Sequence, residues 1–350
     1  MSIKTDTQQT FNIKIHRAAK KRQIPLRVMF ELTYRCNFYC RHCYIPFSYR
    51  KYPEIKTEEI FLILDQLAEL GCFYLGFTGG EPFLRKDIIE ILRHAKKRGL
   101  EVIIYTNGSL IDENVANELK RLRPNKVDIT IPAISKEAFE RITGLRGSRD
   151  KVFKAVELLY KRKVNLGFKS CVLKENESQI DHIQRFASSL GAFHRLDDML
   201  VCCLNGSEEP YKYRKTLAIN PELSLTNKKE PQELNLATER RITKNPKLFK
   251  CGVGINQAAI TPSGELKMCV QIDYPKYKIL ESSLNECWQR LIELVDSLKP
   301  DEYFKCDSCQ LKAYCKWCPG QSWSRTRTFT SCYPESKKRA EAIRRMIQAA

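Results

Sequence analysis

The stretch RVMFELTYRCNFYCRHC, residues 27–43, joins a short apolar run to three closely spaced cysteines. Residues 27–33 have the near-continuous apolar character of a strand in a parallel sheet that is buried on both faces. Cys36, Cys40 and Cys43 follow, with three and then two residues between them. Grouped cysteines after a strand indicate a metal or catalytic site in the loop that the strand ends in.

The same alternation of strand and helix patterns continues along the chain. Six near-continuous apolar runs predict strands, and helical spacing of apolar residues predicts helices between them. Thr57, Asp112 and Ser178 are candidate helix N-caps. Together the runs predict an α/β fold whose core is a partial (βα)6 barrel. The predicted strands are 27–33, 73–80, 101–108, 126–132, 165–173 and 193–204, and the predicted helices are 57–70, 86–99, 112–122, 149–163 and 177–191.

Three polar motifs lie where consecutive predicted strands end. The cysteine loop follows the first strand, GGEP (79–82) ends the second and TNG (106–108) ends the third. The carboxyl ends of parallel strands meet at one edge of a sheet, and functional residues collect there. We therefore expect these motifs to form one site.

Composition limits the class of protein. The 350 residues are 43% apolar and contain no run of about 18 apolar residues that could cross a bilayer. The first residues lack the apolar segment and cleavage site of a secretory signal, so we expect a cytoplasmic protein without a membrane partner. In that reducing compartment the 15 cysteines favour metal or catalytic thiols over disulfides.

The net charge of +19, from 60 basic and 41 acidic residues, raises the question of a nucleic-acid partner. The basic residues are spread along the helices, and no RNP-like, KH-like or helix-turn-helix signature concentrates them, so we do not expect a nucleic-acid partner. Two clusters, residues 14–22 and 337–345, are interpreted as charged faces exposed to solvent.

The cysteines of CNFYCRHC could belong to either of two kinds of metal site. A structural zinc ion takes four closed ligands, and this loop offers three cysteines with His42 between two of them. A [4Fe–4S] cluster on three cysteines instead leaves one iron open. Here the chain resembles the radical S-adenosylmethionine (SAM) enzymes, whose CX3CX2C loop Cys36, Cys40 and Cys43 match. The resemblance implies a SAM ligand on the open iron, reductive cleavage to a 5′-deoxyadenosyl radical, and an electron donor such as flavodoxin or ferredoxin.

The resemblance also implies SAM contacts. His42 stands where the family places a large residue against adenine, with loop packing as the alternative. Gly79, Gly80 and Glu81 match the strand end that holds the methionine amino group, where glycine allows close backbone approach. The third-strand motif supplies Thr106 and Asn107. Thr130 stands where relatives often place a hydroxyl near the methionine carboxylate, although Pro132 and Ala133 follow here in place of the frequent Asp-Gly.

The later cysteines resemble the SPASM extension of radical SAM enzymes, which carries up to two auxiliary [4Fe–4S] clusters. The last interval, between Cys315 and Cys318, is two residues where the family usually has three. A zinc ribbon of CDSC and CKWC is the alternative, but it leaves the other cysteines unexplained. The resemblance assigns one cluster to Cys306, Cys309, Cys315 and Cys332, and the other to Cys251, Cys269 and Cys318 with its fourth ligand open.

The predicted organisation has four parts. Residues 1–26 form a basic extension, 27–204 the radical SAM core, 205–250 a linker, and 251–350 a small SPASM domain with a C-terminal helix. Cys171, Cys202 and Cys203 fall near the ends of the fifth and sixth predicted strands. Each is either a hydrogen donor to a substrate radical, as in some peptide epimerases of the superfamily, or a small buried apolar residue.

The function that the resemblance favours is modification of a ribosomally made peptide by crosslinking, epimerisation or oxidation. The positive charge would suit an acidic leader, and a separate leader-binding protein could assist, because about 26 residues before the first strand are too few for a typical recognition domain. The alternatives are dehydrogenation of a small alcohol or sugar, sulfatase-like protein oxidation, and a non-enzymatic zinc or nucleic-acid-binding protein.

Overall fold

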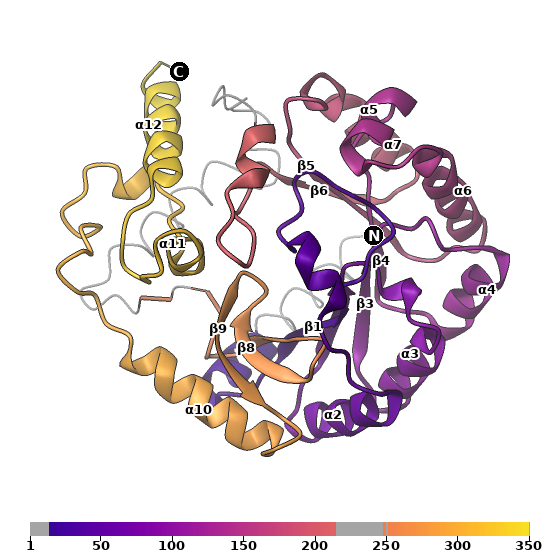
Figure 1. Cartoon of the computed structure of the whole chain (residues 1–350), viewed down its shortest axis with the longest axis horizontal. Helices are drawn as coiled ribbons and strands as arrows, with labels where there is room; N and C mark the ends of the chain where they lie inside the picture. The colour runs from indigo at the N-terminus through magenta and orange to yellow at the C-terminus, as the bar shows by residue number, and fades with distance from the viewer. Residues whose placement is uncertain (1–13, 215–247, 250, 350) are drawn as a thin grey trace.

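The computed structural model describes residues 14–214, 248–249 and 251–349. Within these ranges one sheet of nine strands has the order β6-β5-β4-β3-β2-β1-β7-β8-β9 (Figure 1). The first seven strands are parallel, and β8 and β9 are antiparallel additions. The strands are β1 (Arg27–Thr33), β2 (Tyr74–Gly79), β3 (Glu101–Thr106), β4 (Lys126–Thr130), β5 (Leu166–Cys171), β6 (Phe193–Asp197), β7 (Gln257–Ile260), β8 (Glu265–Cys269) and β9 (Ile272–Lys278).

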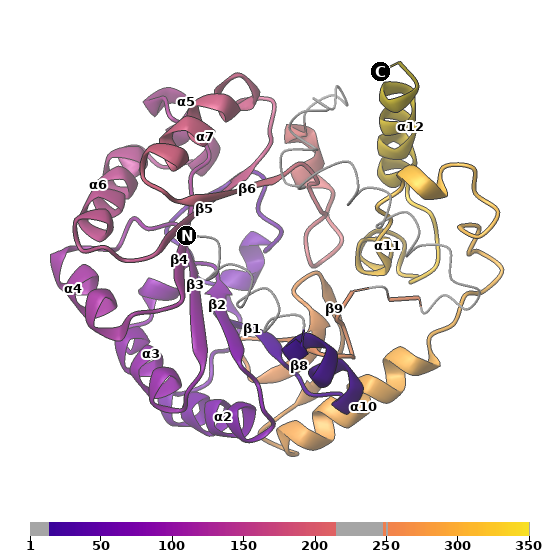
Figure 2. The same ribbon diagram turned by 180° about the vertical axis from the view of Figure 1, so that it is seen from behind.

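Helices cover the convex face of the curved sheet, as in an open barrel (Figures 1 and 2). Each amphipathic helix buries its apolar side there, so the predicted α/β core with a partial barrel is confirmed. The helices of the core are α2 (Thr57–Glu69), α3 (Ile88–Lys97), α4 (Glu113–Leu122), α5 (Lys136–Thr143), α6 (Ser148–Lys161) and α7 (Ile180–Ser189). Of these α5 was not predicted, and α10 (Leu284–Ser297) packs against β8.

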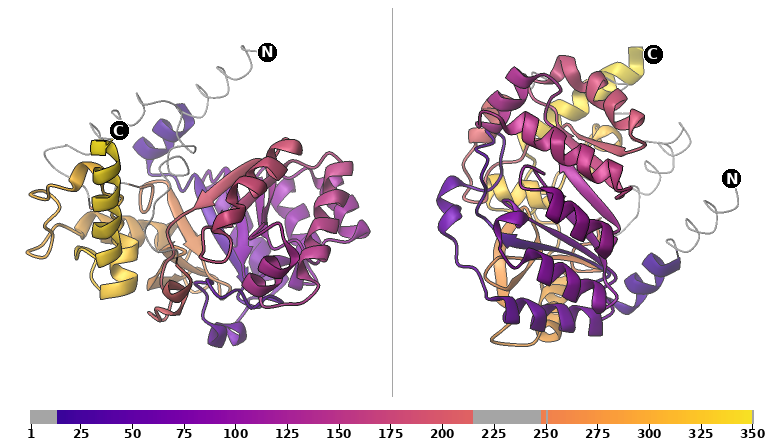
Figure 3. Two further views of the ribbon diagram at one scale, coloured as in Figure 1. Left: turned by 90° about the horizontal axis from the view of Figure 1, so that it is seen from above. Right: turned by 90° about the vertical axis from the view of Figure 1, so that its right-hand side faces the viewer.

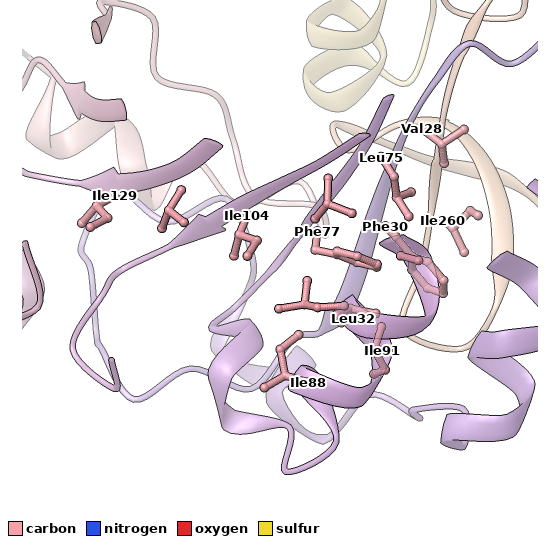
Figure 4. Packing of buried hydrophobic residues seen from close by; sticks show 14 of the residues in the cluster. Val28, Phe30, Leu32, Leu75, Phe77, Ile88, Ile91, Ile104, Ile129 and Ile260 are labelled. Atoms are coloured by element: carbon pink, nitrogen blue, oxygen red, sulfur yellow. The ribbon is translucent and has the colours of Figure 1, made fainter. Parts of the chain in front are cut away.

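The two faces of the sheet differ. Side chains that point outward toward the helices are apolar and buried, including Phe30 of β1, Phe77 of β2 and Ile104 of β3 (Figure 4). The residues between them point inward and include Glu31 and Asp128. The strands are therefore not apolar on both faces as the sequence suggested. The inner face of the sheet carries polar as well as apolar side chains.

The predicted boundaries hold at most elements. Asp112 caps α4 by accepting a hydrogen bond from the backbone of Val115. Thr57 is instead the first residue of α2, and Ser178 lies in a 3-10 turn, η3 (Glu177–Gln179), before α7. The sixth strand ends at Asp197 rather than residue 204, because the chain leaves the sheet where the next residue forms an ion pair with α12 (Pro334–Ala349).

The segment after Cys251 divides in two. Strands β7 to β9 and α10 continue the sheet and its helical cover, a finding that the sequence did not predict. The cysteine-rich loops that follow, with α11 (Pro319–Thr326) and α12, stand beside the core (Figure 3). The predicted linker 205–250 lies largely outside the described residues.

The described part of the basic extension is helical over residues 14–22. It is fixed to the C-terminal segment by a 2.6 Å hydrogen bond from the indole nitrogen of Trp288 to the carbonyl of Gln23. Among the residues described, no helix has the length and apolar character needed to cross a bilayer.

Candidate functional site

The loop after β1 lines a cavity of about 480 Å³. Cys36, Cys40 and Cys43 are half-buried in its wall, beside Gly80 from the end of β2 and Cys203 from the segment after β6. The volume is within the range of about 300 to 1,000 Å³ that is typical of small-molecule sites. The predicted grouping of the cysteine loop with the end of β2 is therefore present.

The three loop thiols lie within electrostatic reach of one another. Burial raises the pKa of Cys36 and of Cys43 to about 11. Glu81 and then Cys43 add to the increase at Cys36, and Cys203 and Cys171 add to it at Cys43. The pKa of Cys40 is raised well above the ordinary value, first by burial and then by Cys43 and Cys36. Thiols with such raised pKa values stay protonated near neutral pH unless a bound metal stabilises the thiolates. The donor set therefore suits a metal cluster.

A single ion is a poorer match for the same residues. Among the described side chains, no group of three or more His, Cys, Asp or Glu is placed to hold one metal ion. A structural zinc needs four such ligands around one centre, so this alternative gains no support. A cubane of four irons is wider than one ion and takes its cysteines further apart.

Arg50 fixes the shape of the cysteine loop. It belongs to a 3-10 turn, η1 (Phe47–Lys51), and its guanidinium donates to the carbonyls of Cys36, at 2.6 Å, and of Phe38. It also lies 4.5 Å from the ring centre of Tyr39. A guanidinium satisfies loop carbonyls that no secondary structure pairs. No sequence motif indicated this role, because Arg50 stands outside the cysteine motif.

The two glycines of GGEP allow the chain to pass against the start of the cysteine loop. A Cβ on Gly79 would lie 2.1 Å from the carbonyl oxygen of Thr33, and one on Gly80 would lie 2.1 Å from that of Arg35. The backbone of Gly80 donates to Thr33 at 2.7 Å, and that of Glu81 to Arg35 at 2.8 Å. The close approach expected toward a ligand is, in this structure, an approach to the backbone that leads into the loop.

Glu81 joins the second and third motifs. Its carboxylate is fully buried and accepts hydrogen bonds from the Thr106 hydroxyl and the Asn107 backbone, both at 2.7 Å, and from Phe83 at 3.1 Å. Burial raises the pKa of Glu81 to about 7, and these hydrogen bonds oppose the increase. The expected meeting of GGEP and TNG is confirmed. The carboxylate holds the two strand ends together, and its contact with a methionine amino group stays a prediction.

Asn107 extends this network to the cysteine loop. Its amide donates to the Asn37 side chain at 2.9 Å and lies 3.9 Å from the sulfur of Cys36. Its own oxygen accepts from Ser109, whose hydroxyl also binds Asn37. The sequence identified Asn107 through its motif. It missed Asn37, which occupies one of the variable positions between the cysteines.

His42 has an unused ring nitrogen. Burial, and then the charge of Lys169, lower the pKa of His42 to about 4, so the ring is neutral near pH 7. Its Nδ1 atom is buried, and no hydrogen-bond partner for it stands among the described residues. A buried nitrogen without a partner is costly unless a ligand satisfies it. The atom therefore supports a ligand beside the cysteine loop, and contact with adenine stays a prediction.

The candidate hydrogen-donor cysteines differ in position. Cys171 is the last residue of β5, and its charge contributes to the raised pKa of Cys40 and of Cys43. Cys203 lines the cavity, with its sulfur 3.5 Å from the carbonyl oxygen of Cys43. Cys202 is buried and is hydrogen-bonded to Tyr211, away from the cavity lining. The structure thus brings two of the three thiols to the cysteine loop.

The C-terminal cysteines form two groups. Burial raises the pKa of Cys306 to about 12, and three other cysteines of its loops add to the increase. Burial likewise raises the pKa of Cys269 to about 12, and the thiols of Cys318 and Cys251, which are distant in the sequence, add to the increase. The first group is Cys306, Cys309, Cys315 and Cys332, and the second is Cys251, Cys269 and Cys318. These are the sets that the sequence resemblance assigned to two clusters.

Comparison with known proteins identifies relatives of the core. A family model of the radical SAM superfamily matches residues 30–187. A PqqA peptide cyclase of Granulibacter bethesdensis is 32% identical over 169 residues, which cover 48% of this chain and 45% of that protein. The chain thus spans about half the length of this relative. An AdoMet-dependent heme synthase of Methanosarcina barkeri is 25% identical over 332 residues, covering 86% of this chain and 93% of that protein.

A solved structure extends the likeness of the fold. SuiB of Streptococcus suis, bound to its precursor peptide SuiA, superimposes with a TM-score of 0.69. The match covers 93% of this chain and 79% of SuiB at 16% sequence identity. It therefore includes the cysteine-rich segment that follows the core.

Proposed function

Because this chain belongs to the radical SAM superfamily, we propose that it cleaves SAM reductively and uses the resulting radical to modify a peptide. The observation that carries the proposal is the group of three loop thiols in the wall of a cavity at the carboxyl end of β1. Cys36, Cys40 and Cys43 would hold a [4Fe–4S] cluster. Such a cluster, when bound, supplies an open iron for SAM and the electron that cleaves it.

The chain's own residues would prepare this site. The Arg50 guanidinium holds the loop carbonyls, so the thiols keep their positions before a cluster is loaded. Glu81 and Asn107 tie the ends of β2 and β3 to that loop. The neutral ring of His42 offers an unpaired nitrogen to a bound nucleoside. Gly79, Gly80, Glu81, Thr106, Asn107 and Thr130 are proposed to surround the methionine part of SAM.

A peptide is the proposed substrate. Two relatives, the PqqA peptide cyclase and SuiB with its precursor peptide, carry peptides in their names. The cavity rim also exposes two stacked rings, Tyr39 at 52% and Phe47 at 66%, with centres 5.7 Å apart. Exposed aromatic pairs beside a cavity are typical of surfaces that bind apolar side chains. The modification would be a crosslink, an epimerisation or an oxidation.

A tetrapyrrole is the second candidate substrate. The heme synthase match spans 93% of that relative, whereas the cyclase match spans 45%. The same cavity rim could stack a flat macrocycle on Tyr39 and Phe47. The two candidates are separated by measuring SAM consumption by the enzyme. Stoichiometric consumption with an added peptide, and none with added porphyrins, would favour the peptide.

The cysteine groups after β7 are proposed to hold two auxiliary [4Fe–4S] clusters. One set has four thiols and the other has three, so the second would keep an open position or recruit a further ligand. Cys171 and Cys203 remain candidate hydrogen donors, since both reach the cysteine loop. We further propose that a flavodoxin or ferredoxin reduces the loop cluster and that a separate protein binds the leader of the substrate. The proposed location is the cytoplasm.

The decisive experiment is anaerobic. Iron and sulfide are reconstituted into the protein and quantified, and SAM with reductant is then added while 5′-deoxyadenosine is measured by mass spectrometry. We expect cleavage in the wild type, and none in the C36A/C40A/C43A triple variant, which should retain the iron of the auxiliary sites. Stoichiometric zinc without cleavage would refute the proposal.

A further inference from the structure

Two cations stand side by side on the inner face of the sheet. Lys169 of β5 pairs in register with Thr130 of β4 on one side and with Arg195 of β6 on the other. Register partners on parallel strands point to the same face. This face is the inner one, because the preceding residue along β5, Phe168, points the other way and stacks on Phe186 of α7, which covers the outer face. Lys169 and Arg195 form a cationic row across β5 and β6.

The charge of this row is not balanced locally. Like charges directly opposite each other on a sheet are destabilising. The Lys169 ammonium has one loose partner, Asp197, at 3.8 Å, and among the described residues no acidic group lies within ion-pair distance of Arg195. One row lower on the same face, Lys126 and Asp128 form a 2.8 Å pair. On the inner face of β4 to β6, the unbalanced positive charge therefore lies in the upper row.

The row lies toward the cysteine loop. Lys169 and Arg195 lie two residues before the last residues of β5 and β6, which are Cys171 and Asp197. The cysteine loop follows the carboxyl end of β1, at the same edge of this parallel part of the sheet. A group bound by the row would thus sit beside the site where a radical is proposed to form.

We propose that Lys169 and Arg195 bind a carboxylate of the substrate. A guanidinium next to an ammonium supplies several charge-assisted donors, which is the geometry that a carboxylate prefers. The substrate class is then a molecule with a carboxylate near the reacting carbon, such as a peptide with a glutamate or aspartate side chain. That the carboxylate belongs to a substrate rests on the proposed function. The methionine carboxylate of SAM has the same chemistry and is the competing source.

The test uses the reconstituted, anaerobic enzyme with and without saturating SAM, and two probes, glutarate and its neutral diamide glutaramide. Binding is measured by calorimetry in the wild type and in the K169M/R195Q variant. The control is K154M/K161M, which removes two charges from the exposed side of α6, where both lysines pair with Glu157. We expect the wild type and the control to prefer glutarate with SAM bound. The row variant should bind it at least about tenfold more weakly, as the loss of one charged hydrogen bond implies.

Each result decides the question. Equal binding of glutarate and glutaramide, or an unchanged affinity in the row variant, would overturn the inference. So would weaker SAM binding in that variant without an effect on glutarate, because the row would then hold the methionine carboxylate. Formation of 5′-deoxyadenosine is measured separately. Its absence together with a retained preference for glutarate would remove the proposed function and leave the carboxylate site.

Discussion

Replacing Lys267 by methionine should destabilise the protein strongly. The ammonium of Lys267 lies 2.8 Å from the carboxylate of Glu31, and both side chains have no exposed surface. The same carboxylate accepts 2.9 Å hydrogen bonds from the hydroxyls of Tyr34 and Tyr44. Methionine keeps the length and apolar stem of lysine and removes its charge. The variant therefore leaves a buried carboxylate with two hydrogen bonds and no counter-charge.

The expected magnitude follows from this burial. Removing one partner of a buried ion pair costs about 3 to 5 kcal/mol, because the remaining charge stays desolvated. Replacing Glu31 by glutamine in the same chain removes that charge. The amide oxygen keeps an acceptor for one tyrosine hydroxyl, and the amide NH2 can donate to the other. The double variant K267M/E31Q should recover about 2 kcal/mol or more of the loss. The control K278M removes an exposed lysine paired with Glu281 and should change the free energy of unfolding by less than about 1 kcal/mol.

The assay is urea unfolding of the cluster-free, fully reduced protein, followed by circular dichroism. Cluster-free protein is used because bound clusters would add their own binding energy to the result. A K267M variant within about 1 kcal/mol of the wild type would refute the reasoning, since a buried charge would then have lost its partner at no cost. A double variant no more stable than the single one would refute it equally.

Three further predictions concern other parts of the molecule. Replacing Arg50 by methionine removes its hydrogen bond to the Cys36 carbonyl, so the iron content of the loop site should fall while iron elsewhere is retained. Iron is measured in R50M alone and in R50M combined with C36A/C40A/C43A, where the loop site is absent and R50M should cause no further loss. The C306A variant should lose about four irons per chain and the C287A variant none, because Cys287 is buried in the core cluster; equal losses would contradict the assignment. Burial lowers the pKa of His194 to about 4, so between pH 6.5 and 4 the unfolded chain binds a proton that the folded chain does not, and stability should fall on acidification. The H194Q variant should flatten this acid limb by about 1 to 2 kcal/mol, read from urea midpoints at each pH.

The sequence predicted the site well where the signal was local. The CX3CX2C spacing, the GGEP and TNG strand ends and the apolar periodicity of the core each lie within a few residues of chain. Because parallel strands align their carboxyl ends, those motifs had to meet, and the hydrogen bonds of Glu81 show that they do. The division of the later cysteines into two groups came from the resemblance to the SPASM extension, and the cluster that each group would hold is a proposal.

Other features depend on residues far apart in the chain. Strand β7 pairs with β1, although more than 200 residues separate them, and no local sequence pattern predicts this pairing. Lys267 of β8 forms an ion pair with Glu31 of β1 near the same pair of strands. Arg50 donates to loop carbonyls that need such a donor only in the folded loop. The cationic row exists because register places Lys169 beside Arg195. The sequence alone determined the elements and the ligand types, since spacing and periodicity are properties of neighbouring residues. Only the tertiary structure decided which charges face each other, because register and burial arise when distant segments pack.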